Sequence, residues 1–492
     1  MFPSFSLRYA RFPDHMRALC QPTQVASPRL FAFNRPLAEE LGFDLQGYDD
    51  EQATQVFSGN RTPEGAEPVA MAYAGHQFAN FVPQLGDGRA LLLGEVIDQH
   101  GRYRDIQLKG SGRTPFSRGG DGRSPLGPVL REYLVSEAMH ALGVPTSRAL
   151  AAVTTGERVV RGVPEPGAVM TRVAASHLRV GTFQYFAARG DTEALRLLAD
   201  EAIERHYPHL QTLTDDGERY LALLDAVAER QAELVARWMG VGFIHGVMNT
   251  DNTAISGETI DYGPCAFMDR FNPRTVFSSI DEQGRYAYVN QPVVLQWNLA
   301  RFAETLVPLI DSDSDRAVER ATPIIRDLAD RYEASWRQVM RAKLGLATEE
   351  DGDGELAQEL LDAMQQGRAD FHLSFRYLAD AVEAGGETAR LSGEFEQREA
   401  LDAWLPRWRE RLAREGVSHA DIVARLQATN PAVVPRNHRV AEAIAAAEQD
   451  DFGPFEALLA AVTNPYTTPA GEVDYTRPPC DEERVLRTFC GT

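Results

Sequence analysis

The hydrophobic pattern of this chain changes near residue 190, and this change constrains the fold more than any other feature of the sequence. Before it, short apolar runs such as residues 91–96 and 103–109 are bounded by glycines, which is typical of strands. After it, apolar residues recur at helical spacing, as in residues 221–240. Strands gathered in one part of a chain and helices in the other predict an α+β fold with two lobes.

Further elements follow from local signals. Residues 125–142 read as a helix, because a proline stands near the first turn and Gly143 follows the last one. We expect strands at 150–160 and 167–173, and helices at 294–309, at 322–344 and over much of 355–450. The expected organisation is an N-terminal extension over 1–70, a strand-rich lobe over 71–190, and a helical lobe with a C-terminal tail over 191–492.

The charge balance restricts the class of partner. The chain carries 50 basic and 71 acidic side chains, a formal net charge of −21, which disfavours nucleic acid as a main partner. The most apolar stretch, residues 221–247, is interrupted by charged residues, so we expect no membrane partner. The N-terminus lacks the apolar core of a secretory signal, and the four cysteines are too few for a disulfide scaffold. These features predict a cytoplasmic protein.

Two segments of the strand-rich part could bind phosphate. In the sequence LGDGR, Gly86 and Gly88 would let the backbone approach a phosphate closely, and Arg89 could bind its oxygens. Taken alone, this pattern is more often a simple hairpin turn. Lys109 ends an apolar strand about twenty residues later. Either Glu132 or Glu137 on the following helix could pair with this lysine, and their spacing does not choose between them.

The segment HGVMNTDN, residues 245–252, carries the strongest signal. It follows a long helix and precedes Asp261 in the sequence DYG. Oxygens of Asn252 and Asp261 are hard ligands suited to Mg²⁺, and Asp251 could accept a proton. For His245 a structural role is the more common one. Together with the glycine loop and Lys109, this segment predicts a site for a nucleoside triphosphate and magnesium.

Several of these motifs together resemble the SelO/YdiU family. They are QLGDGRALLLGE, QLKGSGRTPFSRGGDGR, REYLVSEAMHALG, HGVMNTDN and IDYGP, and they span roughly residues 70–310. The resemblance implies a two-lobed protein-kinase-like fold that binds ATP in an inverted orientation. It also implies transfer of AMP to Ser, Thr or Tyr hydroxyls of target proteins, with release of pyrophosphate.

The resemblance also implies roles for single residues. Asp251 would be the proton acceptor, and Asn252 and Asp261 would bind Mg²⁺, with Mn²⁺ as the alternative. Val247 occupies the place of the catalytic aspartate of a kinase. Positions expected to contact the nucleotide are Gly86, Gly88, Arg89, Lys109, Asp121, Gly122, Glu132, Arg172, Arg179 and Asp261.

Other functions stay open at this point. Transfer of UMP from UTP would need the same phosphate site, and Val247 speaks against a true protein kinase. A non-catalytic, nucleotide-binding scaffold under redox control is a third possibility. Some relatives link a C-terminal cysteine to one after the DYG motif, and here a link from Cys265 to Cys480 or Cys490 stays an open question.

Overall fold

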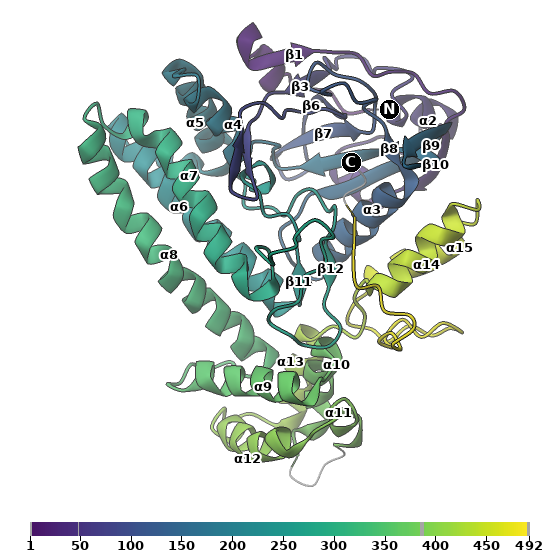
Figure 1. Ribbon diagram of the computed structural model, residues 1–492, viewed down its shortest axis with the longest axis vertical. Coiled ribbons are helices and arrows are strands. Elements are labelled where there is room, and N and C mark those ends of the chain that lie inside the picture. The colour runs from purple at the N-terminus through teal and green to yellow at the C-terminus, as the bar shows by residue number, and fades with distance from the viewer. Residues whose placement is uncertain (1, 48, 384–387, 490–492) are drawn as a thin grey trace.

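The computed structural model describes residues 2–47, 49–383 and 388–489, and the fold is α+β (Figure 1). An antiparallel sheet dominates the N-terminal part, in the strand order β1-β3-β6-β7-β10-β9-β2, with β8 paired to β10. Its strands are β1 (Arg17–Leu19), β2 (Arg29–Phe33), β3 (Val69–Met71), β6 (Ala90–Ile97), β7 (Tyr103–Lys109), β8 (Ser124–Pro125), β9 (Arg148–Arg161) and β10 (Val163–Ala174).

Two small strand pairs lie outside this sheet. One is a hairpin of β4 (Gly75–Gln77) and β5 (Asn80–Val82), and the other pairs β11 (Phe243–Ile244) with β12 (Ala266–Phe267). The strands expected at 91–96, 103–109, 150–160 and 167–173 are confirmed by β6, β7, β9 and β10.

The helices of the first half are α1 (Arg35–Glu40), α2 (Asp50–Phe57), α3 (Leu126–Ala141), α4 (Val180–Ala187), α5 (Thr192–His206) and α6 (Asp216–Gly240). Those of the second half are α7 (Gln291–Ile310), α8 (Ser314–Lys343), α9 (Asp353–Gly367), α10 (Phe371–Arg376), α11 (Ala389–Gly393), α12 (Glu399–Ala413), α13 (His419–Thr429), α14 (Asn437–Ala447) and α15 (Gly453–Val462). The helices expected at 125–142, 221–240, 294–309 and 322–344 are confirmed, although α8 begins eight residues earlier than predicted, at Ser314.

The sheet is covered on both faces. Ile106 and Leu108 of β7 belong to the apolar cluster that includes α1 and α2, while Met170 of β10 packs with α3. Successive residues of a strand point to opposite faces. The residues of β7 that alternate with Ile106 and Leu108 are therefore directed to the α3 side. Helices α14 and α15 pack against α3 as well, although about 300 residues separate them in the sequence (Figure 1).

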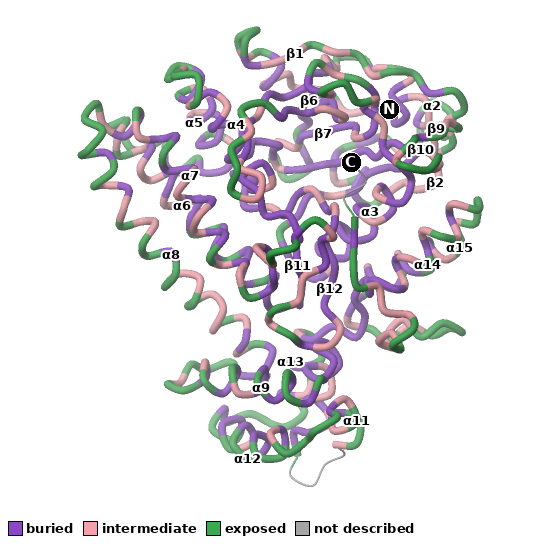
Figure 2. Tube along the Cα trace, viewed as in Figure 1, coloured by how far each residue is buried: buried purple, intermediate pink, exposed green. Residues whose placement is uncertain are grey.

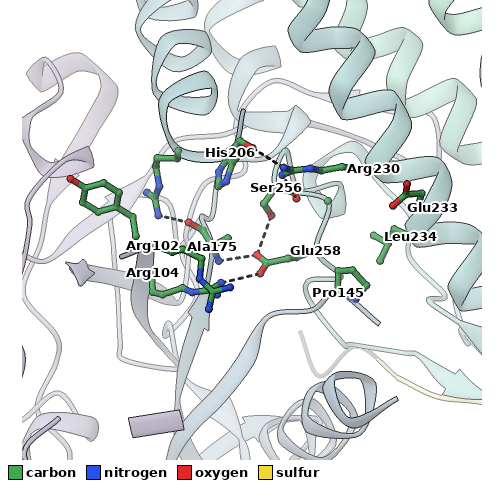
Figure 3. A pocket seen from close by; sticks show the side chains of 13 residues that line it. Arg102, Arg104, Pro145, Ala175, His206, Arg230, Glu233, Leu234, Ser256 and Glu258 are labelled. Atoms are coloured by element: carbon green, nitrogen blue, oxygen red, sulfur yellow. Dashed lines mark hydrogen bonds and ion pairs between the residues drawn. The ribbon is translucent and has the colours of Figure 1, made fainter. Parts of the chain in front are cut away.

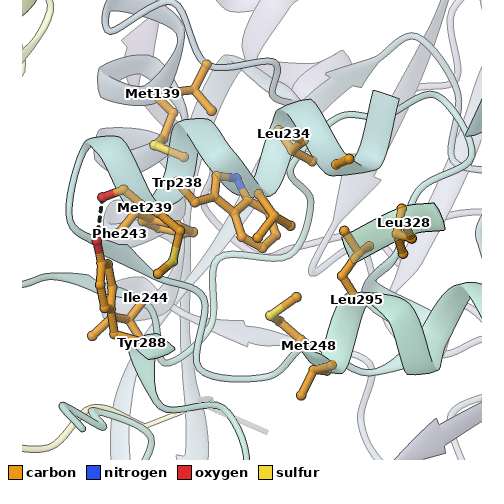
Figure 4. Packing of buried hydrophobic residues seen from close by; sticks show 14 of the residues in the cluster. Met139, Leu234, Trp238, Met239, Phe243, Ile244, Met248, Tyr288, Leu295 and Leu328 are labelled. Atoms are coloured by element: carbon orange, nitrogen blue, oxygen red, sulfur yellow. Dashed lines mark hydrogen bonds between the residues drawn. The ribbon is translucent and has the colours of Figure 1, made fainter. Parts of the chain in front are cut away.

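The helical part is built around α6. Asp215 caps this helix by accepting a hydrogen bond from the backbone N–H of Glu218, and the buried face of α6 packs against α7 and α8. Near its C-terminal end, Trp238 lies in a cluster with Phe243, and the Tyr288 hydroxyl donates to the Met239 carbonyl oxygen at 2.7 Å (Figure 4). Burial is concentrated in the sheet and along α6 (Figure 2). Within the described ranges, no helix is long and apolar enough to cross a membrane.

The tail after α15 returns toward the centre of the molecule. Thr488 pairs with Ser278, and its hydroxyl donates to the Pro264 carbonyl oxygen, next to the DYG segment. Cys265 is buried and Cys480 is exposed, without a disulfide between them. Cys490 lies outside the described residues, so its pairing stays untested.

A buried ion pair connects the start of α14 to the helical part. The guanidinium of Arg436 donates to Asp269 at 2.6 Å and to Asp370 at 2.8 and 3.1 Å. Arg436 is 1% exposed, so its removal leaves two carboxylates without their counter-charge. We expect Arg436→Ala to lower the free energy of unfolding by about 3–5 kcal/mol in a urea titration.

Arg439, one turn further along α14, provides the matched control because it pairs with the half-exposed Glu442. Arg439→Ala is expected to cost about 1 kcal/mol or less. Equal losses for the two variants would contradict the assignment of Arg436 as the buried connection.

Candidate functional site

The pairing of β7 with β10 places three polar side chains on one face of the sheet. Gln107 lies opposite Arg172, and Lys109 lies opposite Met170. Residues directly opposite one another in an antiparallel pair share a face. Gln107, Lys109 and Arg172 are therefore all directed toward α3, and the Arg172 guanidinium donates to Gln107 Oε1 at 2.6 Å.

Lys109 is held by two carboxylates. Its Nζ donates to Glu132 Oε2 at 2.6 Å and to Asp261 Oδ1 at 2.7 Å. Glu137, the alternative on α3, instead binds Arg148 at 2.7 and 2.8 Å. The ambiguity left by sequence spacing is thus resolved in favour of Glu132.

Asp261 collects three cations. Besides Lys109, its Oδ1 accepts a hydrogen bond from Arg172 at 2.6 Å, and its Oδ2 accepts one from Arg179 at 2.7 Å. Burial acts to raise the pKa of Asp261, but the charges of Arg172, Lys109 and Arg179 hold that pKa well below its usual value. The backbone of Asp261 has φ +63°, a conformation that few non-glycine residues adopt. We call Lys109, Arg172, Arg179 and Asp261 the Asp261 cluster.

Asp251 adjoins this cluster but differs from Asp261 in its bonding. It lies in a 3-10 turn, Thr250–Asn252, and its backbone oxygen accepts from Arg179 at 2.8 Å. Its Oδ1 is buried and has no hydrogen-bond partner among the described residues. Burial raises the pKa of Asp251 to about 6. A buried carboxylate oxygen without a partner is costly and is characteristic of a site that receives a ligand.

The neighbouring residues of the 245–252 segment have structural contacts. Asn252 Nδ2 donates to the Val247 carbonyl oxygen at 2.8 Å. His245 is fully buried, and its Nε2 contacts the Ile260 carbonyl oxygen at 2.9 Å. This agrees with the structural role expected for His245.

The β4–β5 hairpin was not predicted as part of the site. Gln77 Nε2 lies 3.4 Å from Asp251 Oδ2, and the backbone N–H of His76 donates to Thr250 Oγ1 at 2.7 Å. Gly75 approaches so closely that a Cβ atom there would lie 2.4 Å from Asp251 Oδ1. The strands have three residues each, which is too short for a periodic pattern to reveal them from the sequence.

The predicted glycine loop is packed against a second loop. A Cβ on Gly86 would lie 2.3 Å from the Phe116 ring, and one on Gly88 would lie 2.9 Å from the Phe116 carbonyl oxygen. Thr114 Oγ1 donates to the Asp87 carbonyl oxygen at 2.6 Å. Within these two loops, glycine is therefore required by close packing, whatever else the loop binds.

Arg89 lies beside the Asp261 cluster. It lines a small cavity of about 20 Å³ together with Lys109 and Glu132. Asp121 and Gly122 have other neighbours: Asp121 pairs with Arg161 at 2.7 Å, and Gly122 packs against the Gly112 backbone. The hydrogen bonds from Arg161 hold the pKa of Asp121 at about 2. Within the described part of the chain, no hydrogen bond or ion pair links Asp121 directly to the Asp261 cluster.

The oxygen atoms at this site suit a magnesium ion that is also bound by phosphate and water, and they do not form a complete metal site by themselves. No group of three or more His, Cys, Asp or Glu side chains among residues 2–47, 49–383 and 388–489 could hold a metal ion. Mg²⁺ is commonly bound by one or two carboxylates together with phosphates and water. Asp251 offers an unpartnered buried oxygen for such a role, whereas both oxygens of Asp261 are engaged by cations.

The contrast between the two aspartates predicts opposite effects on stability. Asp261→Asn would leave Lys109, Arg172 and Arg179 without their shared counter-charge, and we expect the free energy of unfolding to fall by about 3–5 kcal/mol. Asp251→Asn removes a poorly partnered buried charge and should leave stability unchanged or raise it. Urea titrations at pH 7.5 measure both, and a larger loss for Asp251→Asn would contradict this assignment.

Comparisons with known proteins agree with the motifs. A family model described as "Protein adenylyltransferase SelO" matches residues 3–463. The chain is 60% identical over 489 residues to a "Protein nucleotidyltransferase YdiU" of Rhizobium rhizogenes, covering 99% of this chain and 97% of the relative. Identity to the protein of the same name from Rhodopseudomonas palustris strain BisB5 is 58% over 492 residues, covering 100% and 99%. This chain belongs to the SelO/YdiU family of protein nucleotidyltransferases.

Proposed function

We propose that this protein transfers AMP from ATP to Ser, Thr or Tyr hydroxyls of target proteins. The observation that carries the proposal is the Asp261 cluster beside the unpartnered carboxylate oxygen of Asp251. Three cations gathered at one point suit a polyphosphate, and a buried carboxylate next to them suits proton transfer. Membership of a protein nucleotidyltransferase family supports the same reaction.

In this proposal, different residues bind the phosphates and accept the proton. Lys109, Arg172 and Arg179 bind the β- and γ-phosphates and stabilise the charge that develops on them. Asp251 accepts the proton of the target hydroxyl, whose oxygen forms a bond to the α-phosphorus. The bond between that phosphorus and the α–β bridging oxygen breaks, and pyrophosphate leaves.

The resemblance implies Asn252 and Asp261 as the residues that would hold magnesium, with manganese as the alternative. Asp261 would have to exchange one of its cations for the ion, and Asp251 Oδ1 would offer a further oxygen. When bound, the ion supplies further neutralisation of phosphate charge. Gly86, Gly88, Arg89, Asp121 and Gly122 complete the nucleotide site as the resemblance implies, and the position of Arg89 beside Lys109 supports this.

We also assign the fold to the protein-kinase-like class, with residues 71–190 as the nucleotide-binding lobe and 191–492 as the helical lobe. The pairing of a strand lysine with a helix glutamate, Lys109 with Glu132, is the pairing that protein kinases use. Asp261 occupies the Asp-x-Gly position of those enzymes. The paucity of cysteines supports the reducing cytoplasm as the place of reaction.

Phosphoryl transfer by a kinase mechanism is disfavoured by Val247. A kinase uses an aspartate of its catalytic loop to accept the hydroxyl proton. Val247 takes that place here, is buried, and accepts a hydrogen bond from Asn252 through its backbone oxygen. The choice of adenine as the nucleobase rests on the family model, which is described as an adenylyltransferase, whereas the relatives' names say only nucleotidyltransferase.

The reaction is tested by the position of a radiolabel. Purified protein is incubated with Mg²⁺, cell extract and ATP labelled at either the α- or the γ-phosphate, with α-labelled UTP in parallel. We expect protein-bound label from α-labelled ATP and none from γ-labelled ATP, because pyrophosphate carries the γ-phosphate away. The label should vanish in Asp261→Ala, which loses the centre of the cluster.

Each other labelling pattern would support a different function. Protein-bound γ-label would overturn the proposal in favour of a kinase, and label from UTP alone would change the nucleotide to UMP. Absence of all label, with thermal stabilisation by ATP, would leave the nucleotide-binding scaffold.

Gly75 tests the position of Asp251. In Gly75→Ala, the new Cβ would displace the Asp251 carboxylate, since the two would otherwise lie 2.4 Å apart. Misplacement of a reacting group by about 1 Å costs on the order of a hundredfold in rate, and we expect such a loss in kcat for AMP transfer. Gly393→Ala is the control, because nothing lies within 4 Å of its Cβ position. Equal activity of the two variants would argue against Asp251 as proton acceptor.

A further inference from the structure

A second hollow lies at the far end of β7 from the Asp261 cluster. It has a volume of about 510 Å³ (Figure 3), and its lining residues include Tyr103, at the first position of β7. Lys109 is the last position of that strand, which places the two roughly 20 Å apart at about 3.3 Å per residue. The pocket is thus separate from the proposed active site, and its size is typical of small-molecule sites.

The lining of this pocket is basic in a protein of strongly negative net charge. Four arginines and two glutamates line it: Arg102, Arg104, Arg205, Arg230, Glu233 and Glu258. The chain as a whole carries a formal charge of −21. Arg205 is matched by Asp105 at 2.7 Å, so an anionic ligand would be recognised by the other arginines around the hollow.

Arg230 is the cation with the least compensation. It lies on the exposed side of α6, and its guanidinium donates to the backbone oxygens of His206 at 2.7 Å and of Ser256 at 3.4 Å. It also lies over the Tyr207 ring, 4.2 Å from the ring centroid. No carboxylate of the described residues lies within 4.0 Å of it, the limit of an ion pair. Its charge is therefore not neutralised by a carboxylate, and the Tyr207 ring on one side leaves the rest of the guanidinium to a ligand.

Arg104 faces Arg230 across the Ser256–Glu258 segment (Figure 3). Its Nε donates to Asp98 at 3.0 Å, while its Nη1 lies 3.7 Å from Glu258 Oε1, beyond hydrogen-bond distance. Arg102 shares the same Asp98 oxygen at 2.9 Å. Arg102 also donates to Glu40 Oε1 at 3.2 Å, so two carboxylates match its charge. The Nη atoms of Arg104 have carboxylate neighbours only beyond hydrogen-bond distance, Glu258 at 3.7 Å and Glu40 at 4.0 Å, which leaves their N–H donors to a ligand.

The acidic residues of the lining do not cancel this capacity. Glu258 Oε2 accepts hydrogen bonds from the Ala175 backbone N–H at 2.8 Å and from Ser256 Oγ at 3.1 Å, so that carboxylate is committed to the pocket wall. Glu233 is exposed, one turn from Arg230 on α6.

We propose that this pocket binds a small phosphorylated anion, at a site distinct from the proposed nucleotide site. Guanidinium groups bind phosphate oxygens in a fork geometry, and Arg104 and Arg230 approach the hollow from opposite sides. The ligand connects β7 to α6. It also contacts the Ser256–Glu258 segment, which lies between Asn252 and Asp261 in the sequence.

The test is direct binding of labelled inorganic phosphate in equilibrium dialysis, which does not depend on any transfer activity. We expect saturable binding to the full-length protein, weakened roughly ten- to a hundredfold in Arg230→Gln, as loss of a charge-assisted hydrogen bond predicts. Arg237→Gln is the matched control. Arg237 is also exposed on α6 and donates to a backbone oxygen, that of Gly143, but it does not line the pocket.

A second variant separates the two basic sites. Lys109→Ala changes the Asp261 cluster and should retain phosphate binding at the pocket. Binding that is lost in Lys109→Ala but kept in Arg230→Gln would assign phosphate to the cluster alone and overturn the proposal. Absence of saturable binding, or equal weakening in Arg230→Gln and Arg237→Gln, would overturn it as well.

Discussion

The carboxylate of Asp261 is the point on which the two parts of this protein converge. Lys109 and Arg172 reach it from the adjacent strands β7 and β10. Arg179, the residue that precedes α4, reaches it from the start of that helix. Arg172 is 1% exposed, and such a guanidinium is tolerated only when its charge is matched at short range. The same contacts that make this burial tolerable also fix the cations around one point, beside Asp251.

The elements that can be predicted from the sequence are those with a local signal. The bounds of β7 follow from a short segment between Gly101 and Gly110, and the end of α6 follows from Gly240. The sequence could not choose between Glu132 and Glu137, since that choice depends on Arg148, which binds Glu137 from another strand. Strands β1 and β2 were missed for a related reason, because their partners β3 and β9 lie about 50 and 120 residues further along the chain.

The β4–β5 hairpin shows strain next to the proposed chemistry. Phe78 and Ala79, the two residues of its turn, have φ of 50° and 66°, where Asn-Gly or another glycine-containing pair is the usual choice. Each such residue costs on the order of 1–2 kcal/mol. The turn is held by the backbone N–H of Phe78, which donates to Asn249 Oδ1 at 3.2 Å. Gln77 is the residue directly before this turn, and its Nε2 lies 3.4 Å from Asp251 Oδ2. The strained turn thus lies next to the contact between the hairpin and Asp251.

The charges around Asp261 have a consequence for any polyanion that enters. The described neighbourhood contains four cations and four carboxylates: Arg89, Lys109, Arg172, Arg179, Asp87, Glu132, Asp251 and Asp261. With all these carboxylates ionised, the neighbourhood has no net positive charge. Its basic residues can therefore bind a polyanion only by exchanging a carboxylate for it. A triphosphate must displace a carboxylate from its cations, and it binds with least electrostatic cost when it brings counter-ions of its own.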